Sequence, residues 1–353
     1  MIREIIVRLV ERENLSYENS REVMKEIMSG DATSAQLAAF LTALRMKGET
    51  VEEISAFAET MRENCRRIHP RVTGRLLDTC GTGGDRVKTF NVSTAAAFVI
   101  AGAGVAIAKH GNRSVTSHCG SADVLERLGL NLNTNREAVE CAIERIGIGF
   151  MFAPAFHPAM KHAASSRKEI GIRTIFNVLG PLANPALANA QLLGVYDGKL
   201  VEPVAYVLRK LGCEEAMVVH GLDGLDEIST IGKTAMAWLR EGEVATLEIV
   251  PSDFGVKQVT KEALFVSSPE ESAETIFGIL HGYCRADDPK MELVLVNSAA
   301  GIIVGGKAED FLHGMEVARK SVKSGAAYKK LKELIHATGG DLSKLEELES
   351  KYA

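Results

Sequence analysis

The sequence predicts an α/β protein, with a small all-helical N-terminal domain ahead of a large α/β domain whose mostly parallel central sheet is flanked by helices. Apolar residues have helical spacing in the first sixty-odd residues, whereas from Arg75 onward short apolar runs alternate with amphipathic segments. Strands that alternate with helices are typical of parallel sheets covered on both faces. A chain of 353 residues is also long enough to form two domains.

The N-terminal part is expected to consist of short amphipathic helices. Apolar side chains recur at helical spacing in segments 2–9, 23–28, 37–44 and 54–61. Thr33 with Gln36, and Thr50 with Glu53, have the spacing of capping boxes, which satisfy the unpaired N–H groups at a helix start. The apolar faces of these helices either enclose a core of their own or partly pair with a second copy of the chain.

The rest of the chain is expected to alternate between strands and helices. Strands are expected at 76–77, 105–108, 149–152, 191–196, 216–220, 235–239 and 244–250. Helices are expected at 93–102, 121–128, 201–211, 269–280, 291–303 and 308–323. Ligands of such proteins bind at the carboxyl ends of the parallel strands. The loops after the first two strands are therefore candidate binding loops.

The first of these loops has the composition of an anion-binding loop. It reads Gly-Thr-Gly-Gly-Asp at 81–85, and the next helix is predicted to begin near Ser93 and Thr94. Glycines let backbone N–H groups turn towards an anion, because no Cβ blocks the approach. A helix N-terminus adds further N–H donors and the positive end of its dipole. The second loop adds Lys109 and Arg113 as cations, so we infer a site for a phosphate-rich ligand.

Other phosphate-binding motifs fit this stretch poorly. A Walker A loop requires glycine directly before Lys-Ser/Thr, whereas Val87 precedes Lys88-Thr89. Gly102-x-Gly104 lacks the third glycine of a dinucleotide-binding fingerprint. The glycines alone are compatible with a tight strand-to-helix turn, but a mere turn requires neither the adjacent aspartate nor the polar second loop.

Two further segments carry charged side chains with the chemistry to bind a metal ion or a carboxylate. Asp226 and Glu227 follow the strand expected at 216–220, and Mg²⁺ typically takes one or two carboxylates together with phosphate oxygens and water. The competing interpretation of this pair is a solvated acidic turn. Arg167 can hold a carboxylate through two parallel hydrogen bonds, or it is a surface or helix-capping arginine.

Composition and charge narrow the class of partner. A formal net charge of −5 gives no general affinity for nucleic acid or for an anionic membrane. The longest apolar run, 95–108, is too short to span a bilayer, and the N-terminus lacks the apolar region of a signal peptide. The six cysteines form no C-x-x-C pair and suit a reducing compartment, so we expect neither disulfides nor zinc. A cytoplasmic protein with small-molecule substrates is expected.

Five motifs together closely resemble the anthranilate phosphoribosyltransferases, a family of tryptophan biosynthesis. They are Gly-Thr-Gly-Gly-Asp at 81–85, Asn-Val-Ser-Thr at 91–94, Lys-His-Gly-Asn-Arg at 109–113, Phe-Asn-Val-Leu-Gly-Pro-Leu-Ala-Asn-Pro at 176–185 and Asp-Glu at 226–227. The resemblance covers nearly the whole chain. It implies Mg²⁺-dependent transfer of phosphoribose from 5-phosphoribosyl 1-pyrophosphate (PRPP) to the amine of anthranilate, with release of pyrophosphate.

The resemblance also implies a domain organisation. The small helical domain is expected to comprise 1–67 and a helical insertion at about 161–190, and to form a homodimer. The large α/β domain is expected to comprise 68–160 and 191–353 and to bind PRPP. The nucleoside phosphorylases share this fold.

Individual residues acquire expected roles from the same resemblance. Contacts with PRPP are implied for Gly81, Gly84, Asp85, Thr89, Asn91, Val92, Ser93, Thr94, Lys109, His110, Gly111, Asn112, Arg113, Ser114, Val115, Thr116, Ser117 and Ser121. Contacts with anthranilate are implied for Gly81, Asn112, Arg167, His110, His157 and Pro181. Metal contacts are implied for Ser93, Asp226 and Glu227. Catalytic roles are expected for Arg167, Lys109 and Asp85.

Two other functions stay open on the sequence alone. One is a pyrimidine nucleoside phosphorylase, which uses phosphate without metal and whose loop resembles Ser-Thr-Gly-Gly-Val-Gly-Asp. The other is a non-catalytic phosphoribosyl-binding protein. The Asp226–Glu227 pair favours the transferase over the phosphorylase. Release of free base from uridine and phosphate would identify a phosphorylase, and loss of anthranilate fluorescence with PRPP and Mg²⁺ would identify a transferase.

Overall fold

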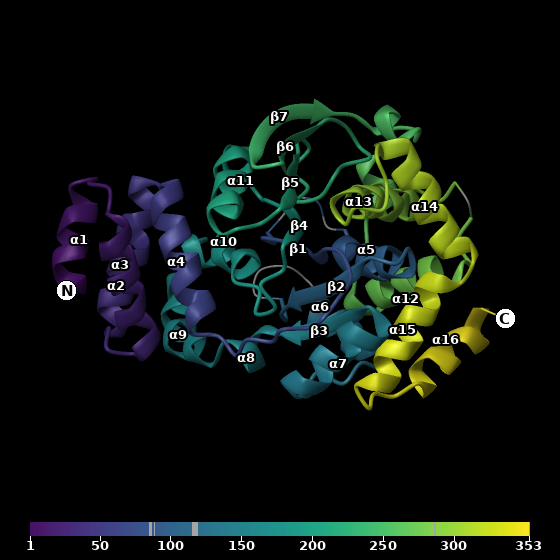
Figure 1. Ribbon diagram of the computed structural model, residues 1–353, viewed down its shortest axis with the longest axis horizontal. Coiled ribbons are helices and arrows are strands. Elements are labelled where there is room, and N and C mark those ends of the chain that lie inside the picture. Colours follow the sequence, from purple (N-terminus) through teal and green to yellow (C-terminus); the bar gives the residue numbers. More distant parts are fainter. Residues whose placement is uncertain (85–86, 88, 115–118, 286, 353) are drawn as a thin grey trace.

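The computed structural model describes residues 1–84, 87, 89–114, 119–285 and 287–352. The N-terminal helices are α1 (Ile2–Val10), α2 (Tyr17–Ser29), α3 (Ser34–Lys47) and α4 (Val51–Glu63). Both predicted capping boxes are confirmed, with Thr33 and Gln36 at the start of α3 and Thr50 and Glu53 at the start of α4. Figure 1 shows these helices at one end of the molecule, beside the domain that contains the sheet.

The large domain is built on a seven-stranded sheet in the order β3-β2-β1-β4-β5-β6-β7. Its strands are β1 (Leu76–Gly81), β2 (Ala106–Gly111), β3 (Ile148–Phe152), β4 (Ala190–Gly194), β5 (Glu215–Gly221), β6 (Thr234–Arg240) and β7 (Glu243–Ile249). The first five strands are parallel, and β6 and β7 add an antiparallel edge. All seven expected strands are present. Strands β1 and β2 extend further than expected, so Gly81 and residues 109–111 belong to the sheet rather than to loops.

The remaining helices follow the N-terminal bundle along the chain, and several of them pack on the sheet. They are α5 (Val92–Gly102), α6 (Ser121–Arg127), α7 (Arg136–Ile146), α8 (Ala153–Phe156), α9 (Lys161–Ile170), α10 (Ile175–Leu182), α11 (Val201–Lys210), α12 (Pro269–His281), α13 (Pro289–Val304), α14 (Phe311–Lys323), α15 (Ala326–Ala337) and α16 (Ser343–Tyr352). Short 3₁₀ turns are η1 (Pro158–Met160), η2 (Gly198–Leu200), η3 (Pro251–Phe254) and η4 (Lys261–Leu264). The sequence-based expectation omitted α7, α8, α15 and α16. Helix α16 gives a weak periodic signal, because Leu345 is its one buried residue within the described part of the chain.

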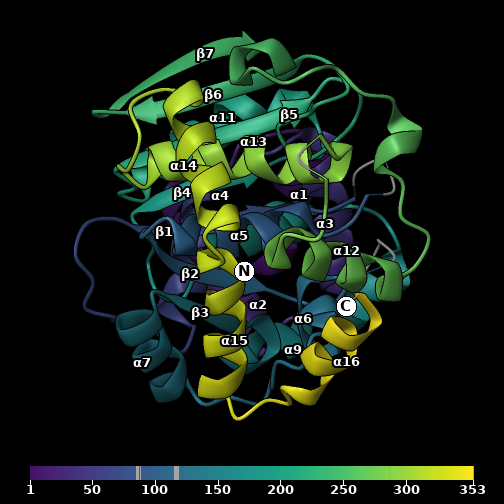
Figure 2. The same ribbon diagram turned by 90° about the vertical axis from the view of Figure 1, so that its right-hand side faces the viewer.

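The two faces of the sheet belong to different cores. Met217 and Val219 of β5 join the apolar cluster formed with α5, α12, α13, α14 and α15. Ala216 and Val218 point the other way, because successive side chains of a strand alternate, and they join a cluster with α10 and α11. That second cluster continues into the N-terminal helices through residues such as Phe57. Figure 2 looks onto the first face, with the N-terminal helices behind the sheet.

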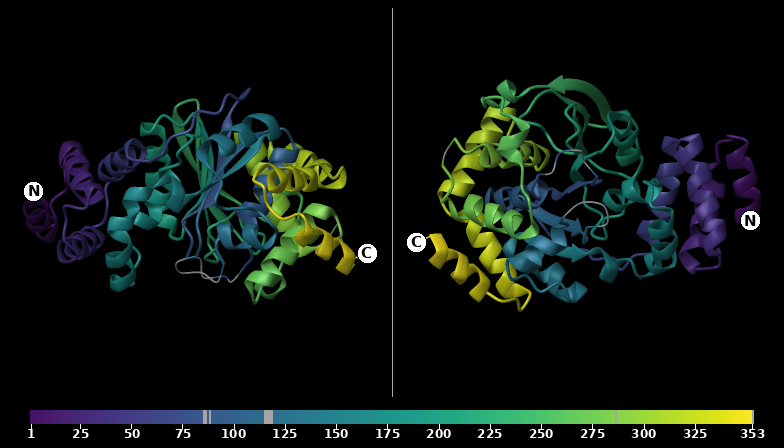
Figure 3. Two further views of the ribbon diagram at one scale, coloured as in Figure 1. Left: turned by 90° about the horizontal axis from the view of Figure 1, so that it is seen from below. Right: turned by 180° about the vertical axis from the view of Figure 1, so that it is seen from behind.

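Helix α9 lies against the N-terminal helices, although it is far from them in sequence (Figure 3). A Cβ at Gly30, after α2, would lie 2.6 Å from the ring nitrogen Nδ1 of His162. The Ser166 hydroxyl donates a hydrogen bond to the Ser34 carbonyl at 3.4 Å. Close packing at Gly30 therefore lets α9 lie against the N-terminal helices.

Candidate active site

The candidate site lies at the carboxyl edge of the parallel strands. Strand β1 is central to it, because the chain continues from β1 to β2 and β3 on one side and later returns to β4 on the other. Such a reversal of strand order leaves a crevice at the carboxyl ends, where open α/β sheets bind ligands. The glycine loop begins at the end of β1. The loop that carries Asp226 follows β5, which lies beyond β4 in the sheet.

The glycine loop is fixed from several sides. The Thr82 N–H donates to the Gly194 carbonyl, and the Thr82 hydroxyl accepts from the N–H of Tyr196, both at 2.9 Å. The Gly83 N–H donates to the Asp226 carboxylate at 2.8 Å. A Cβ at Gly81 would lie 2.5 Å from that carboxylate, which explains why glycine is required here. Hydrogen bonds to the end of β4 and to the Asp226 side chain thus hold the loop in place.

Asp226 and Glu227 contact the two parts of the predicted phosphate site, which are the glycine loop and the start of α5. Asp226 contacts the glycine loop, and a Glu227 carboxylate oxygen accepts from the Ser93 N–H, in the first turn of α5, at 3.1 Å. Burial raises the pKa of Asp226, against the lowering effect of the Gly83 N–H. These contacts are incompatible with a solvated acidic turn.

Ser93, Asp226 and Glu227 have donor chemistry that fits Mg²⁺. All three offer hard oxygen atoms, and a divalent cation would offset the cost of ionised carboxylates that are partly buried. No group of three or more His, Cys, Asp or Glu side chains among the described residues is arranged to hold a metal. Two carboxylates with a hydroxyl suit an ion that also takes phosphate oxygens and water.

Lys109 lies beneath the phosphate loops rather than in an exposed loop. It is 3% exposed, and its ammonium donates to the Thr79 carbonyl at 2.5 Å and to the Ser93 hydroxyl at 3.5 Å. Burial lowers the pKa of Lys109, while the nearby Asp78 carboxylate acts in the opposite direction. The Thr94 hydroxyl is buried without a hydrogen-bond partner among the described residues. Lys109 therefore provides positive charge directly behind the start of α5.

The second loop is organised by Asp123 of α6. One carboxylate oxygen of Asp123 accepts from the N–H groups of Ser114 and Gly120, at 3.0 and 2.9 Å. Arg113, which was expected to serve as a cation of the phosphate site, pairs through its guanidinium with Asp123 at 2.9 Å and with Glu126 at 2.8 Å. Two carboxylates thus neutralise Arg113, and a phosphate would have to compete with them.

Other predicted PRPP contacts adjoin these loops. Asn91 occupies the N-cap position of α5 without a side-chain capping bond. Its side-chain amide donates to the Cys119 carbonyl at 3.0 Å, and its side-chain oxygen accepts from the Ser272 hydroxyl at 3.0 Å. Asn91 thereby bridges the two loops. Ser121 begins α6 and donates to the Asn112 carbonyl at 3.4 Å. Four predicted site residues lie outside the described residues: Asp85, Val115, Thr116 and Ser117.

A second group of predicted residues gathers on the opposite face of β2. The rings of His110 and His157 lie 5.0 Å apart, and Nδ1 of His110 is 3.2 Å from the Gly180 carbonyl, next to Pro181. Burial lowers the pKa of His110 to about 3 and that of His157 to about 4. Both rings are therefore neutral near pH 7, and together with Pro181 they form an uncharged wall suited to an aromatic substrate.

Sequence reasoning missed two buried residues behind His110. Asn184 donates to the Asp78 carboxylate and to the Ala108 carbonyl, each at 2.8 Å. Asp78 in turn accepts from the His110 N–H at 3.3 Å. Burial raises the pKa of Asp78 to about 6. Asn184 belongs to the 176–185 motif, so the sequence offered a signal for it. Asp78 had no comparable signal, because its position is that of an ordinary strand residue.

Arg167 lies on α9 with its guanidinium 5.1 Å from the centre of the Phe176 ring. Burial lowers its pKa. No carboxylate among the described residues pairs with this guanidinium. Arg167 is therefore available to bind an acidic group, unlike Arg113.

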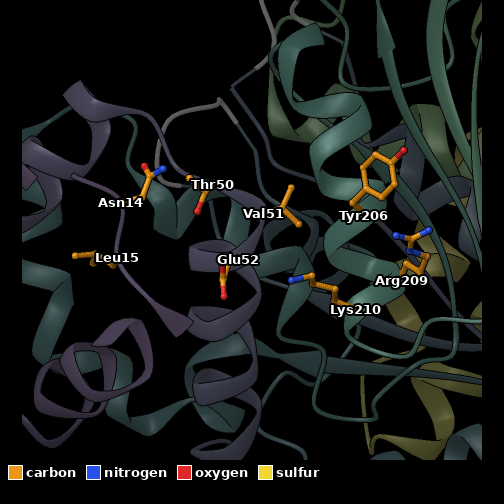
Figure 4. Close-up of a pocket in the computed structure, with 8 residues that line it drawn as sticks. All are labelled: Asn14, Leu15, Thr50, Val51, Glu52, Tyr206, Arg209 and Lys210. Atoms are coloured by element: carbon orange, nitrogen blue, oxygen red, sulfur yellow. The ribbon is translucent and has the colours of Figure 1, made fainter. Parts of the chain in front are cut away.

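A separate cavity of about 400 Å³ opens where the N-terminal helices meet α11 (Figure 4). Its lining comprises Asn14, Leu15, Thr50, Val51, Glu52, Tyr206, Arg209 and Lys210. None of these is a predicted substrate residue. The cavity marks the junction of the two domains and lies apart from the candidate site.

Fold and site define a two-domain glycosyltransferase. Residues 3–65 match the helical bundle domain of a glycosyl transferase family, and residues 73–328 match its a/b domain. Anthranilate phosphoribosyltransferases from Methanocorpusculum labreanum and Geobacter sulfurreducens are each 50% identical, covering 96% of this chain and 99% of theirs. The chain belongs to the anthranilate phosphoribosyltransferase family.

Solved structures agree with this assignment. The anthranilate phosphoribosyltransferase of Thermus thermophilus superposes with a TM-score of 0.89 at 39% identity, covering 95% of this chain and 99% of that one. The Saccharomyces cerevisiae protein in complex with PRPP and Mg has a TM-score of 0.87 at 29% identity, covering 96% and 98%. None of the helices in the described part of our chain has the length and apolar character needed to span a membrane.

Proposed function

We propose that the crevice between the glycine loop, the start of α5 and the Asp226 loop transfers the 5-phosphoribosyl group of PRPP to the amine of anthranilate. The main support for the proposal is that both acidic residues accept hydrogen bonds from the candidate phosphate-binding segments. Asp226 accepts from the Gly83 N–H, and Glu227 accepts from the Ser93 N–H. The complex of a relative with PRPP and Mg supports the same substrate and ion. The family resemblance supplies the individual roles expected of the site residues.

We assign the two substrates to opposite sides of β2. We assign PRPP to the α5 side, where Ser93 and Lys109 meet, and anthranilate to the side of His110 and His157, with Arg167 holding its carboxylate. Asp226, Glu227 and Ser93 would hold Mg²⁺, whose charge stabilises the departing pyrophosphate. Lys109 contributes positive charge on the same side.

The reaction needs little acid–base catalysis from the protein. The amine nitrogen of anthranilate forms a bond to ribose C1 as the bond from C1 to pyrophosphate breaks, and the amine loses one proton. An aromatic amine is neutral near pH 7, so its lone pair is available without a strong base. With pKa values of about 3 and about 4, the His110 and His157 rings are weak bases, which agrees with a site that orients the amine rather than deprotonating it.

Loss of anthranilate fluorescence on mixing with PRPP and Mg²⁺ tests the proposal directly. We expect turnover that requires all three components. The same protein mixed with uridine and phosphate should release no uracil. Absence of anthranilate turnover, with release of uracil, would instead identify a phosphorylase.

We also propose a domain division and a homodimer. The small domain would comprise 1–67 with about 161–190, and the large domain 68–160 with 191–353; the packing of α9 on the N-terminal helices supports this division. Val7, Val10 and Met46 are 63–71% exposed on α1 and α3, so a second copy has an apolar surface to cover. Val7→Glu should convert a dimer into monomers in analytical ultracentrifugation, whereas a monomeric wild-type protein would refute the proposal.

We also propose a cytoplasmic location for the protein. All six are unpaired in the structure, which supports a reducing cytoplasm. Fractionation of native cells that placed the protein in an oxidising compartment would contradict this assignment.

A further inference from the structure

The described residues of the glycine loop are each held by a contact from another part of the chain. Thr82 bonds to residues at the end of β4, and Gly83 bonds to Asp226. The carbonyl of Gly84 accepts a hydrogen bond from Nη2 of Arg173. The first contacts come from the large domain, whereas Arg173 lies between α9 and α10, in the segment proposed for the small domain. Arg173 has no role in the motifs that identify the family.

The guanidinium of Arg173 is fixed between two surfaces. On one side it lies over the Tyr196 ring, 4.5 Å from the ring centre. On the other it lies against Gly84, where a Cβ would approach three guanidinium atoms at 2.7, 2.9 and 3.0 Å. Gly84 also has a φ of +79°, which favours glycine. A flat cation that stacks on an aromatic ring and donates to a carbonyl is a contact that lysine does not reproduce.

Arg173 connects the glycine loop to the segment between α9 and α10. The segment that carries Arg173 also carries Arg167 on α9 and Pro181 on α10. A movement of this segment would therefore be transmitted to the carbonyl of Gly84.

We propose that Arg173 is a positioning residue for phosphoribosyl transfer: stacked on Tyr196, it holds Gly84 and so fixes the glycine loop in the shape that receives PRPP. The proposal rests on the proposed function and adds a residue to it. Arg173 acts through Gly84 and is not assigned a contact with either substrate.

The test compares Arg173→Ala and Arg173→Lys with a matched control. Arg209 makes the same kind of contact away from the site, 4.9 Å from the Tyr206 ring and donating to the Gly242 carbonyl at 3.3 Å. Arg209→Ala therefore removes an equivalent stacked arginine without touching the loop. Binding of PRPP in the presence of Mg²⁺ is measured by calorimetry, the KM of each substrate by anthranilate fluorescence, and folding by thermal unfolding.

Arg173→Ala and Arg173→Lys should each raise the Kd and KM for PRPP by about tenfold or more, because small displacements of a binding loop are costly. The KM for anthranilate should change by less than about twofold, and the melting temperature should match that of Arg209→Ala. Wild-type PRPP affinity in Arg173→Ala, or full recovery in Arg173→Lys, would overturn the proposal. Inactivity of the wild-type and Arg209→Ala proteins would instead refute the proposed function.

Discussion

The Asp226 carboxylate accepts a hydrogen bond from the Gly83 N–H at 2.8 Å, although 143 positions separate the two residues. The neighbouring Glu227 makes the equivalent contact with the Ser93 N–H at the start of α5. The acidic pair and the phosphate loops are therefore one structural unit. Changes on either side are expected to alter how the protein uses Mg²⁺ and PRPP together.

Removal of the acidic charges should change the magnesium requirement. In a protein with Asp226→Asn and Glu227→Gln, the Mg²⁺ concentration for half-maximal activity should rise at least about tenfold, because neutral amides are weaker ligands for a hard cation. Activity is measured over a Mg²⁺ titration at fixed PRPP. Asp253→Asn is a suitable control, because Asp253 accepts from the N–H of Val250 in a distant exposed turn. Unchanged magnesium dependence would remove the pair from the site.

Arg167→Ala should selectively impair the use of anthranilate. Loss of a hydrogen-bonded charge contact costs about 1.5–3 kcal/mol, which corresponds to a roughly 10- to 160-fold higher KM for anthranilate. The affinity for PRPP should stay near its wild-type value. Steady-state kinetics with each substrate varied in turn measures both. The exposed neighbour Lys168 provides the control Lys168→Ala, and equal losses for both substrates would contradict the assigned role.

Ser93→Ala should weaken the binding of PRPP with Mg²⁺. The hydroxyl meets the Lys109 ammonium at 3.5 Å, and the loss of one such group costs about 0.5–1.5 kcal/mol, or roughly 2- to 12-fold in Kd. Calorimetric titration with PRPP measures the change. Ser298→Ala is a matched control, since that buried hydroxyl bonds to the Val294 carbonyl within its own helix. Wild-type affinity in Ser93→Ala would leave Ser93 with only a role at the helix start.

Acid should destabilise the protein through its buried histidines. The pKa of His157 is lowered from 6.5 to about 4 by burial, so its stabilising contribution is complete above pH 6.5 and is lost as the pH falls towards 4. Between pH 7 and 5 this amounts to about 2 kcal/mol. Asp78 acts in the opposite direction, because its raised pKa, about 6, makes the folded state bind its proton first. The wild-type profile thus combines opposing contributions.

A variant isolates the histidine contribution. His157→Asn should lose about 2 kcal/mol less stability than the wild type between pH 7 and 5, since asparagine does not titrate. Urea unfolding at a series of pH values gives the free energies. His69→Asn is the control at a histidine outside the buried pair. Parallel pH profiles for wild type and His157→Asn would show that His157 is not kept neutral by the fold.

The sequence predicted local structure well where the signal was periodic. The capping boxes at Thr33 and Thr50 and all seven strands are confirmed. Helices with few buried apolar residues, such as α16, gave too weak a pattern. The glycine spacing in 81–85 predicted a binding loop, because the conformational freedom of glycine is a property of the residue itself.

What the sequence by itself determined is the fold class, the positions of the two candidate phosphate-binding loops and the residues that resemble the family. Only the tertiary structure decided which of these groups meet. It paired Arg113 with Asp123 and Glu126, left Arg167 without a carboxylate among the described residues, and placed Arg173 on Gly84. Periodicity and glycine content depend on a few neighbouring residues, so they can be read from the sequence. The partners of charged side chains depend on how distant segments pack, so they are set only once the chain has folded.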